Sequence, residues 1–221
     1  MSKIIIVGTL AFDTIETPFG KVERVLGGSA PFATLAAKTK DIECAIISIV
    51  GNDFPKKYID IFKDKGIDVS QVQIDKNGKT FFWEGRYHEN MKSRDTLDTQ
   101  VNVLEKFNPV LPDNFKEIDV LVLGNLDPEV QIKVIEQFYK KPDFTMLDTM
   151  NFWMDNSLES LKKVIKKVDL ICINDEEVIQ LSGCDNLNEG VVSILTMGPK
   201  YIIMKRGEYG ASVYSSSNKF T

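Results

Sequence analysis

The feature that most constrains this chain is a regular alternation of short apolar runs with longer amphipathic stretches. Runs rich in β-branched residues, such as Ile4–Val7 and Leu170–Ile173, are separated by stretches of helical periodicity. This rhythm is typical of βα units around a mostly parallel sheet, whose strands are apolar on both faces. It predicts strands at Lys3–Gly8, Ala45–Val50, Val120–Gly124, Thr145–Asp148, Leu170–Ile173 and Tyr201–Lys205, and helices that begin near Ser29, Phe54, Pro128, Ser157, Asp175 and Leu187.

Two segments break the rhythm. Asp13–Leu26 contains a hairpin-like pair around Phe19-Gly20, and Thr80–His88 has the pattern of a strand with several bulky aromatic residues. Because neither carries a helix, we expect both to leave the main sheet and form a small second sheet. Such a flap can close over a cleft, where its aromatic side chains either exclude water or cover ordinary core.

Composition excludes several classes of protein. The 221 residues are 43% hydrophobic, which is enough for one large core. The formal charge of -5 comes without a basic stripe, which argues against nucleic-acid binding, and the three cysteines lack the spacing of a zinc site or a disulfide framework. No run approaches the roughly 20 apolar residues of a membrane span, and the apolar start is too short for a secretion signal. We therefore expect a cytoplasmic protein that binds neither nucleic acid nor membrane.

Polar and glycine-rich residues follow the first strand, where an open parallel sheet binds its ligands. The carboxylate of Asp13 can accept hydrogen bonds from neighbouring hydroxyls of a polyol, although a turn-forming Asp is the alternative. Gly27 and Gly28 then lead into the apolar helix Phe32–Lys38, which Ser29 can cap. The amides at this helix start can bind an oxygen-rich ligand, but a structural turn has the same pattern.

Similar segments follow the later strands, at Asp148–Asn151, Asn174–Glu177 and Lys205–Gly210. Asn174 and Glu177 have the spacing of a capping box, and the competing interpretation is that they organise magnesium-bound water and phosphate. The two cations and two glycines of the last segment can let the backbone approach a nucleotide phosphate, with a solvated turn as the alternative.

Five motifs occur in a fixed order along essentially the whole chain: Gly8 to Asp13, Gly27-Gly28, Ile49–Asp53, Asn174–Glu177 and Lys205–Gly210. In that order they resemble the ribokinase-like, or PfkB-type, carbohydrate and nucleoside kinases. The resemblance implies a three-layer α/β fold with a central, mostly parallel sheet and a small β-sheet lid. The core would comprise residues 1–12, 27–78 and 106–221, and the lid segments residues 13–26 and 79–105.

The resemblance also implies an ATP-dependent phosphotransferase that uses Mg²⁺ to phosphorylate a hydroxyl of a sugar or related small alcohol. By that similarity the substrate would contact Asp13, Gly27, Gly28, Ser29, Phe32 and Asn151, the last of which would lie on a strand end. The nucleotide would be bordered by Asn174, Glu177, Lys205, Arg206, Gly207 and Gly210, with Glu177 also serving the metal. A homodimer through the exposed face of the lid is a further partner that the resemblance implies.

One departure from the family pattern concerns the substrate. Phe32 stands where sugar-specific members carry a sugar-binding Asn. This leaves a nucleoside kinase as the nearest alternative, because lid aromatics such as Phe82, Trp83 and Tyr87 can stack on a base.

A second departure concerns catalysis. The family places its catalytic base in a late D-T-x-G-A-G-D segment, and nothing between Gly210 and Thr221 matches it. We therefore expect the sequence to be part of a longer kinase and to be inactive by itself, with no catalytic residue among those present. A non-catalytic ligand-binding module of the same fold is the alternative.

Overall fold

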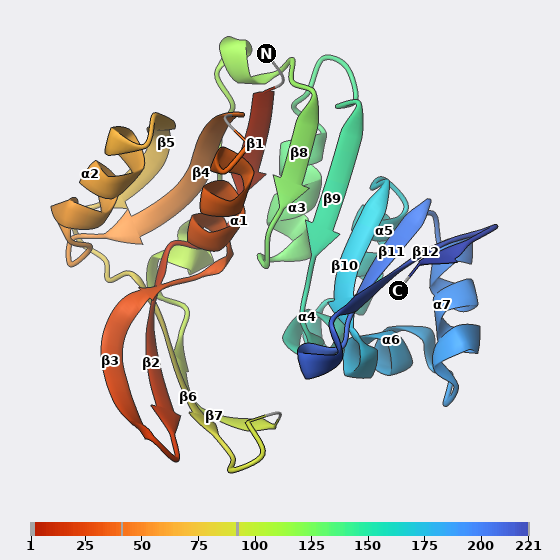
Figure 1. Cartoon of the computed structure of the whole chain (residues 1–221). Coiled ribbons are helices and arrows are strands. Elements are labelled where there is room, and N and C mark those ends of the chain that lie inside the picture. The colour runs from red at the N-terminus through yellow and green to blue at the C-terminus, as the bar shows by residue number, and fades with distance from the viewer. Residues whose placement is uncertain (1–2, 41, 92, 221) are drawn as a thin grey trace. The chain divides into compact units, whose positions relative to one another are not determined.

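The computed structural model describes residues 3–40, 42–91 and 93–220. The chain divides into two units, Met1–Pro109 and Val110–Thr221, which are described individually (Figure 1). Met1 and Ser2, on which the expectation about a secretion signal partly rests, lie outside the described residues.

The first unit contains three parallel strands, β1 (Lys3–Val7), β4 (Glu43–Gly51) and β5 (Ile67–Asp75). Helices α1 (Ser29–Lys38) and α2 (Lys56–Asp64) pack against them (Figure 1). The apolar runs of β1 and β4 are almost entirely buried, as the sequence predicts. Strand β5 was not predicted, because most of its side chains are polar and at least partly exposed.

A second, four-stranded sheet extends from the same unit (Figure 1). Its order is β3-β2-β6-β7, in which β2 pairs antiparallel with β3 and parallel with β6. The two segments that break the βα rhythm supply three of its strands, so the expectation of a separate small sheet is confirmed. The fourth, β7, was not predicted because its sequence RDTLDTQ is exposed and charged. The strands are β2 (Ala11–Thr17), β3 (Gly20–Gly27), β6 (Phe81–Tyr87) and β7 (Arg94–Gln100), and the short 3-10 helix η1 (Asn102–Lys106) follows.

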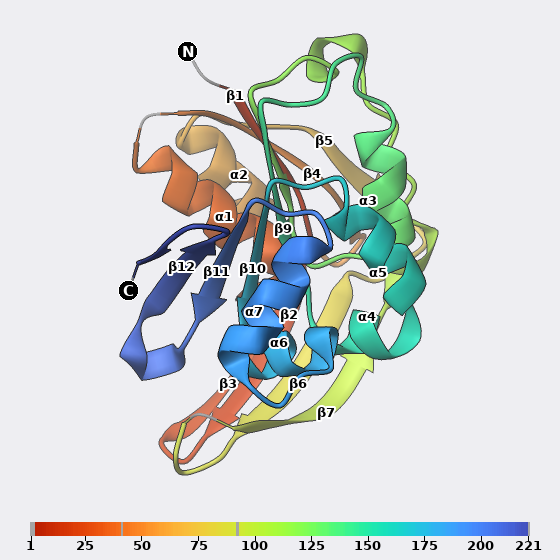
Figure 2. The ribbon, with the colours of Figure 1, turned by 90° about the vertical axis from the view of Figure 1, so that its right-hand side faces the viewer.

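The second unit contains a mostly parallel sheet in the order β8-β9-β10-β11-β12-β13, of which the last two strands are antiparallel additions. Its helices lie along one face of the strands (Figure 2). The strands are β8 (Val120–Leu123), β9 (Phe144–Asp148), β10 (Leu170–Asn174), β11 (Tyr201–Lys205), β12 (Ala211–Ser215) and β13 (Lys219–Phe220). The helices are η2 (Asp113–Phe115), α3 (Pro128–Ile135), α4 (Asn151–Asn156), α5 (Leu158–Ile165), α6 (Asp175–Ser182), α7 (Leu187–Thr196) and η3 (Gly207–Tyr209).

The α/β class with a mostly parallel sheet and a smaller sheet is therefore confirmed. Fully buried branched side chains such as Leu147, Ile171 and Ile173 form the core of the second unit. Within the described part of the chain, we find no helix with the length and apolar character needed to span a membrane.

Candidate functional site

The start of α1 is held by Thr9, a residue that the sequence analysis did not select. The backbone N–H of Ser29 donates to Thr9 Oγ1 at 2.9 Å, and the backbone N–H of Ala30 donates to the Thr9 carbonyl oxygen at 3.1 Å. In return, the N–H of Thr9 donates to Ser29 Oγ at 3.2 Å. The prediction that Ser29 caps the helix is wrong, because the N-cap residue is Gly28 and Ser29 is the first helical residue. Thr9, 20 residues away, supplies the missing cap.

These contacts also limit which amides at this helix start can bind a ligand, and such binding stays a prediction. Two of them, those of Ser29 and Ala30, are already satisfied by Thr9. Gly28 has a φ of 92°, and a β-carbon there would lie 2.3 Å from the Thr9 carbonyl oxygen. Glycine is therefore required at position 28, both for its conformation and for the close approach of the Thr9 backbone.

The carboxylate of Asp13 lies beside the glycine pair. A β-carbon on Gly27 would come within 2.2 Å of Asp13 Cγ, so the missing side chain leaves the space that the carboxylate fills. Burial raises the pKa of the Asp13 carboxyl to about 6, although a hydrogen bond from the Gly28 backbone lowers it. The fold therefore holds a partly desolvated acid at this point, which is a better acceptor for a ligand hydroxyl than a carboxylate surrounded by water.

Trp83 shares a face of the four-stranded sheet with Asp13. The two residues are directly opposite one another in the β2–β6 pairing, so their side chains project to the same side. The indole lies across Gly85, where a β-carbon would be 2.1 Å from its ring, and its N–H donates to Thr96 Oγ1 at 3.3 Å. The indole is therefore fixed over β6 and β7, on the same face of the sheet as Asp13.

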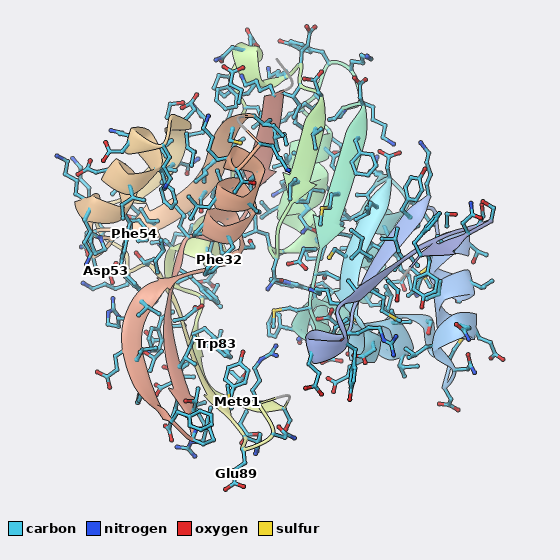
Figure 3. The ribbon with its side chains drawn as sticks, in the orientation of Figure 1. Phe32, Asp53, Phe54, Trp83, Glu89 and Met91 are labelled. Carbon is cyan, nitrogen blue, oxygen red and sulfur yellow. The ribbon has the colours of Figure 1, made fainter. Side chains whose placement is uncertain are left out.

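The aromatic run of β6 is divided between the two faces of the sheet. Phe82 pairs with Phe12 and lies on the face opposite to Trp83, because neighbouring residues of a strand point to opposite sides. Phe32, on the first turns of α1, is 64% exposed. Figure 3 shows Phe32 where the four-stranded sheet begins and Trp83 farther along that sheet.

In the second unit, Asn174 and Glu177 form the predicted capping box at the start of α6. The backbone N–H of Glu177 donates to Asn174 Oδ1, and the N–H of Asn174 donates to Glu177 Oε2, both at 2.7 Å. Glu177 is buried. The capping interpretation is confirmed, and any contact of these side chains with phosphate or metal must be made in addition to it.

Asp148 was not among the predicted site residues, but it contacts one of them, Lys205. Lys205, at the end of β11, places its Nζ 3.3 Å from Asp148 Oδ1 at the end of β9. Burial raises the pKa of the Asp148 carboxyl, and the nearby Lys205 charge offsets this only in part. Burial lowers the pKa of the Lys205 ammonium, but Asp148, Cys172 and Glu177 together outweigh burial, and the net pKa lies above its ordinary value. The ends of the parallel strands therefore hold a positive charge in a fixed place.

The next residue, Thr149, is buried and its Oγ1 has no hydrogen-bond partner among the described residues. Lys205 is paired with Asn174 in the β10–β11 register, so these residues lie side by side at the strand ends. A buried hydroxyl without a partner and a fixed ammonium are both groups that suit an oxygen-rich anion.

The segment after β11 forms a closed turn. The backbone N–H of Arg206 donates to the Gly210 carbonyl at 2.8 Å, and that of Gly210 donates to the Gly207 carbonyl at 3.2 Å. Gly207 and Gly210 have φ values of 55° and 80°, and a β-carbon on either would meet nothing within 4 Å. The backbone of this turn is exposed, and its place beside a nucleotide stays a prediction.

Asn151 lies in a different setting from the one predicted. It is the first residue of helix α4, which the sequence analysis did not predict, and is not a strand-end residue. Its side-chain amide donates to Gln180 Oε1 of α6. This bond ties α4 to α6, so a structural role accounts for Asn151 as observed.

The structure thus brings the predicted residues together in two sets. Asp13, Gly27, Gly28 and Ser29 meet within the first unit, while Asn174, Glu177 and Lys205 meet within the second. Thr9 and Asp148 were missed because their partners are 20 and 57 positions away, and no local pattern reveals such pairs. The polar character of the strand-end segment beginning at Asp148 was the only available signal.

Comparisons with known proteins agree on one relationship. A family model described as pfkB family carbohydrate kinase matches residues 1–221. A cytidine kinase of Thermococcus kodakarensis is 24% identical over 221 residues, which span 98% of this chain and 77% of that protein.

Two solved structures share the fold. A nucleoside kinase of Methanocaldococcus jannaschii, an archaeal member of the ribokinase family, superposes with a TM-score of 0.77 at 20% identity, covering 100% of this chain and 75% of that one. A candidate ribokinase II of E. coli in complex with ATP and Mg²⁺ gives a TM-score of 0.76 at 21% identity, covering 100% and 77%.

Proposed function

Because the chain belongs to the pfkB family of carbohydrate kinases, we propose that it serves an ATP- and Mg²⁺-dependent transfer of a phosphoryl group to a hydroxyl of a sugar or related small alcohol. One observation carries the substrate half of this proposal. The Asp13 carboxylate is held against Gly27 and Gly28 with a raised pKa, which suits it to accept hydrogen bonds from sugar hydroxyls.

The substrate site around Asp13 would also be lined by Gly27, Gly28, Ser29 and Phe32, in the roles expected from the family resemblance. Ser29 would act mainly through the backbone, since its hydroxyl is 3.2 Å from the Thr9 N–H and 3.4 Å from Thr9 Oγ1. Asn151 would contribute by holding α4 in place through Gln180.

A nucleoside is a second candidate substrate, and Trp83 is the observation that favours it. Its indole lies on the face of the sheet that carries Asp13, where it can stack on a base while Asp13 binds the ribose. The similarity to a cytidine kinase and to a nucleoside kinase supports the same candidate.

On the nucleotide side, Lys205, Arg206, Gly207 and Gly210 would border the phosphates. Lys205 would neutralise phosphate charge, and its pairing with Asp148 would hold the ammonium in position. The open space beside Gly207 and Gly210 would admit the nucleotide.

Magnesium fits this site only as an ion held largely by water and phosphate. The described residues contain no group of three or more His, Cys, Asp or Glu side chains that could hold a metal. Mg²⁺ commonly uses one or two carboxylates together with waters and substrate phosphates. Asn174 and Glu177 would therefore orient metal-bound water, and the orphaned hydroxyl of Thr149 would complete the phosphate contacts. When bound, the metal neutralises charge that develops on the transferred group.

The test is a binding panel of free sugars against nucleosides, measured by calorimetry with and without an ATP analogue and Mg²⁺. Saturable binding of sugars supports the leading proposal, and binding of nucleosides alone replaces it with the second candidate. Trp83→Ala should then weaken nucleoside binding about tenfold and leave free sugars unaffected. Leu97→Ala, which removes an exposed apolar side chain from neighbouring β7, is the control.

Transfer of phosphate from ATP is measured in parallel. Transfer would exclude the alternative of a non-catalytic binding module. Binding without transfer is expected of both hypotheses, because nothing among these residues matches the D-T-x-G-A-G-D segment that carries the catalytic base. We also propose a cytoplasmic location and a homodimer through the four-stranded sheet. Light scattering over a range of protein concentrations would test for the dimer.

A further inference from the structure

A hydrogen-bonded cluster lies on the face of the four-stranded sheet opposite to Asp13 and Trp83. At its centre is Asp53, whose side chain is 17% exposed. Asp53 Oδ1 accepts from both the backbone N–H and the Oγ1 hydroxyl of Thr80 at 2.8 Å, and Asp53 Oδ2 accepts from Arg24 Nη2 at 2.9 Å. Asp53, in the loop after β4, therefore contacts Arg24 of β3 and Thr80, the residue that precedes β6.

Thr80 fixes the point at which β6 begins. Its side chain is buried and also accepts from the Gly51 backbone N–H at 3.0 Å, while its carbonyl accepts from Asn102 Nδ2 at 3.0 Å. A β-carbon on Gly51 would lie 2.4 Å from the Lys79 backbone, so glycine allows this crossing. Trp83 lies three residues beyond Thr80, so its position along the sheet depends on this anchor.

Arg24 stabilises the pairing of β3 with β2. Its φ is 50°, a left-handed conformation that costs free energy for a non-glycine residue and persists only where surrounding contacts hold it. Its backbone N–H donates to Thr14 Oγ1 at 3.1 Å, next to the register shift between Asp13 and Ile15. Its guanidinium carbon is 4.3 Å from the centroid of the Phe12 ring. Arg24 therefore contacts Phe12 and Thr14 of β2, the two neighbours of Asp13 in the chain.

The pKa of Asp53 agrees with an ion pair to Arg24 that persists at neutral pH. Burial raises the pKa of the Asp53 carboxyl, but hydrogen bonds from Thr80 and Arg24 outweigh burial and leave the pKa below its ordinary value. Asp53 is thus ionised at neutral pH. A cavity of about 350 Å³ is lined by members of the cluster, yet Arg24, Asp53, Thr80 and Asn102 are already bonded to one another. These contacts favour a structural connection over a second ligand site.

We propose that Arg24 and Asp53 are positioning residues that hold Asp13 and Trp83 in register across the β2–β6 pair. This inference rests on the proposed function for its consequence in substrate binding. Loss of the Arg24–Asp53 connection would let β2 and β6 shift relative to one another without unfolding either. Small displacements of binding groups are costly, because a hydrogen bond weakens steeply with misalignment.

The test uses Arg24→Gln and Asp53→Asn, with Arg86→Gln as the matched control. Arg86 forms an ion pair with Glu16 of the same length, 2.9 Å, and has nearly the same exposure, 52% against 51%. This pair also joins β6 to β2, but it lies three residues beyond Asp13 and Trp83 and does not contact Asp53, so it controls for the loss of any ion pair between these strands. We expect both test variants to weaken sugar or nucleoside binding about tenfold, with the affinity for an ATP analogue unchanged. Arg24→Lys, which keeps the charge, should recover part of the loss.

A second readout is independent of the ligand. The chain contains two tryptophans, so Trp153→Phe leaves Trp83 as the only indole emitter. In that background, Arg24→Gln and Asp53→Asn should shift the Trp83 emission and raise its accessibility to acrylamide, and Arg86→Gln should do neither. If the parent protein binds no sugar or nucleoside, the proposed function fails while the Trp83 readout still decides the positioning role. If Trp83 emission and ligand affinity match those of Arg86→Gln, the positioning role is overturned.

Discussion

The carboxylate of Asp13 occupies the space in which Gly27 lacks a side chain. A β-carbon at position 27 would lie 2.2 Å from both Cγ and Oδ2 of Asp13, far inside van der Waals contact. The pair lies 14 residues apart in the chain but directly at the entry to α1. The absence of a side chain at Gly27 therefore determines where the Asp13 carboxylate points. Substituting either residue tests this relationship.

Gly27→Ala should displace the Asp13 carboxylate. We expect substrate binding to weaken about tenfold or more and the free energy of unfolding to fall by about 1–3 kcal/mol, as for other overpacked sites. Gly20→Ala is the control, since its β-carbon meets nothing within 4 Å although its φ of 151° is strained. Calorimetry and urea unfolding measure the two effects. Equal binding by Gly27→Ala and Gly20→Ala would refute the steric argument.

Asp13→Asn should stabilise the protein in a pH-dependent way. The pKa of Asp13 is about 6 in the folded state against an ordinary 3.8, so the folded state binds a proton more tightly than the unfolded chain. This contribution to stability is fully present below pH 3.8 and is lost as the pH rises through about 6. We therefore expect the variant to exceed the parent by about 1–3 kcal/mol at pH 8 and to match it near pH 4.

Urea unfolding of both proteins between these pH values checks this, and a difference independent of pH would contradict it. The same substitution should weaken substrate binding above pH 6, since it removes the charged acceptor. A loss of affinity together with a gain of stability would identify Asp13 as a functional group held at a cost to the fold.

Thr9→Val should destabilise α1. Valine has nearly the same shape but cannot accept from the Ser29 backbone N–H, so one amide at the helix start loses its partner. Loss of a helix cap costs about 0.5–2 kcal/mol. Thr39→Val, at the exposed end of the same helix, should cost less because its hydroxyl bonds only the Ala36 carbonyl in contact with solvent. Chemical unfolding compares the two, and equal losses would argue against the cap.

Lys205→Gln should affect nucleotide binding and stability together. Removing the ammonium leaves Asp148 without its ion-pair partner, so the pKa of Asp148 should rise further. The buried carboxylate then destabilises the fold more at pH 8, where it is ionised, than at pH 5, where it is more often protonated. We therefore expect the free energy of unfolding to fall by about 1–2 kcal/mol, with the larger fall at the higher pH. Affinity for an ATP analogue should fall about tenfold.

Lys200→Gln is the control for this prediction. Lys200 also pairs with a buried aspartate, Asp169 at 3.0 Å, but it precedes β11, whereas Lys205 ends that strand. It should change stability without changing nucleotide affinity. Loss of nucleotide binding in both variants would mean that Lys205 acts through general stability.

The predictions from sequence were most accurate where the signal is local. Strand Tyr201–Lys205 and helices Pro128–Ile135, Asp175–Ser182 and Leu187–Thr196 begin where the apolar periodicity and the capping residues indicate. Strands β5 and β7 were not predicted because their exposed, polar side chains carry little periodic signal, and pairing with a neighbouring strand decides their structure.

The amino-acid sequence was sufficient to predict the α/β class, the separate small sheet, the capping box of Asn174 and Glu177, and the residues that carry the family resemblance. These follow from periodicity, glycine placement and short-range hydrogen bonding, which act over a few residues. The tertiary structure alone decided that Thr9 and not Ser29 caps α1, that Gly27 accommodates Asp13, that Asp148 holds Lys205, and that Asp53 joins Arg24 to Thr80. Each of these contacts joins residues far apart in the chain, and it exists only once packing of the apolar strands brings their polar ends together.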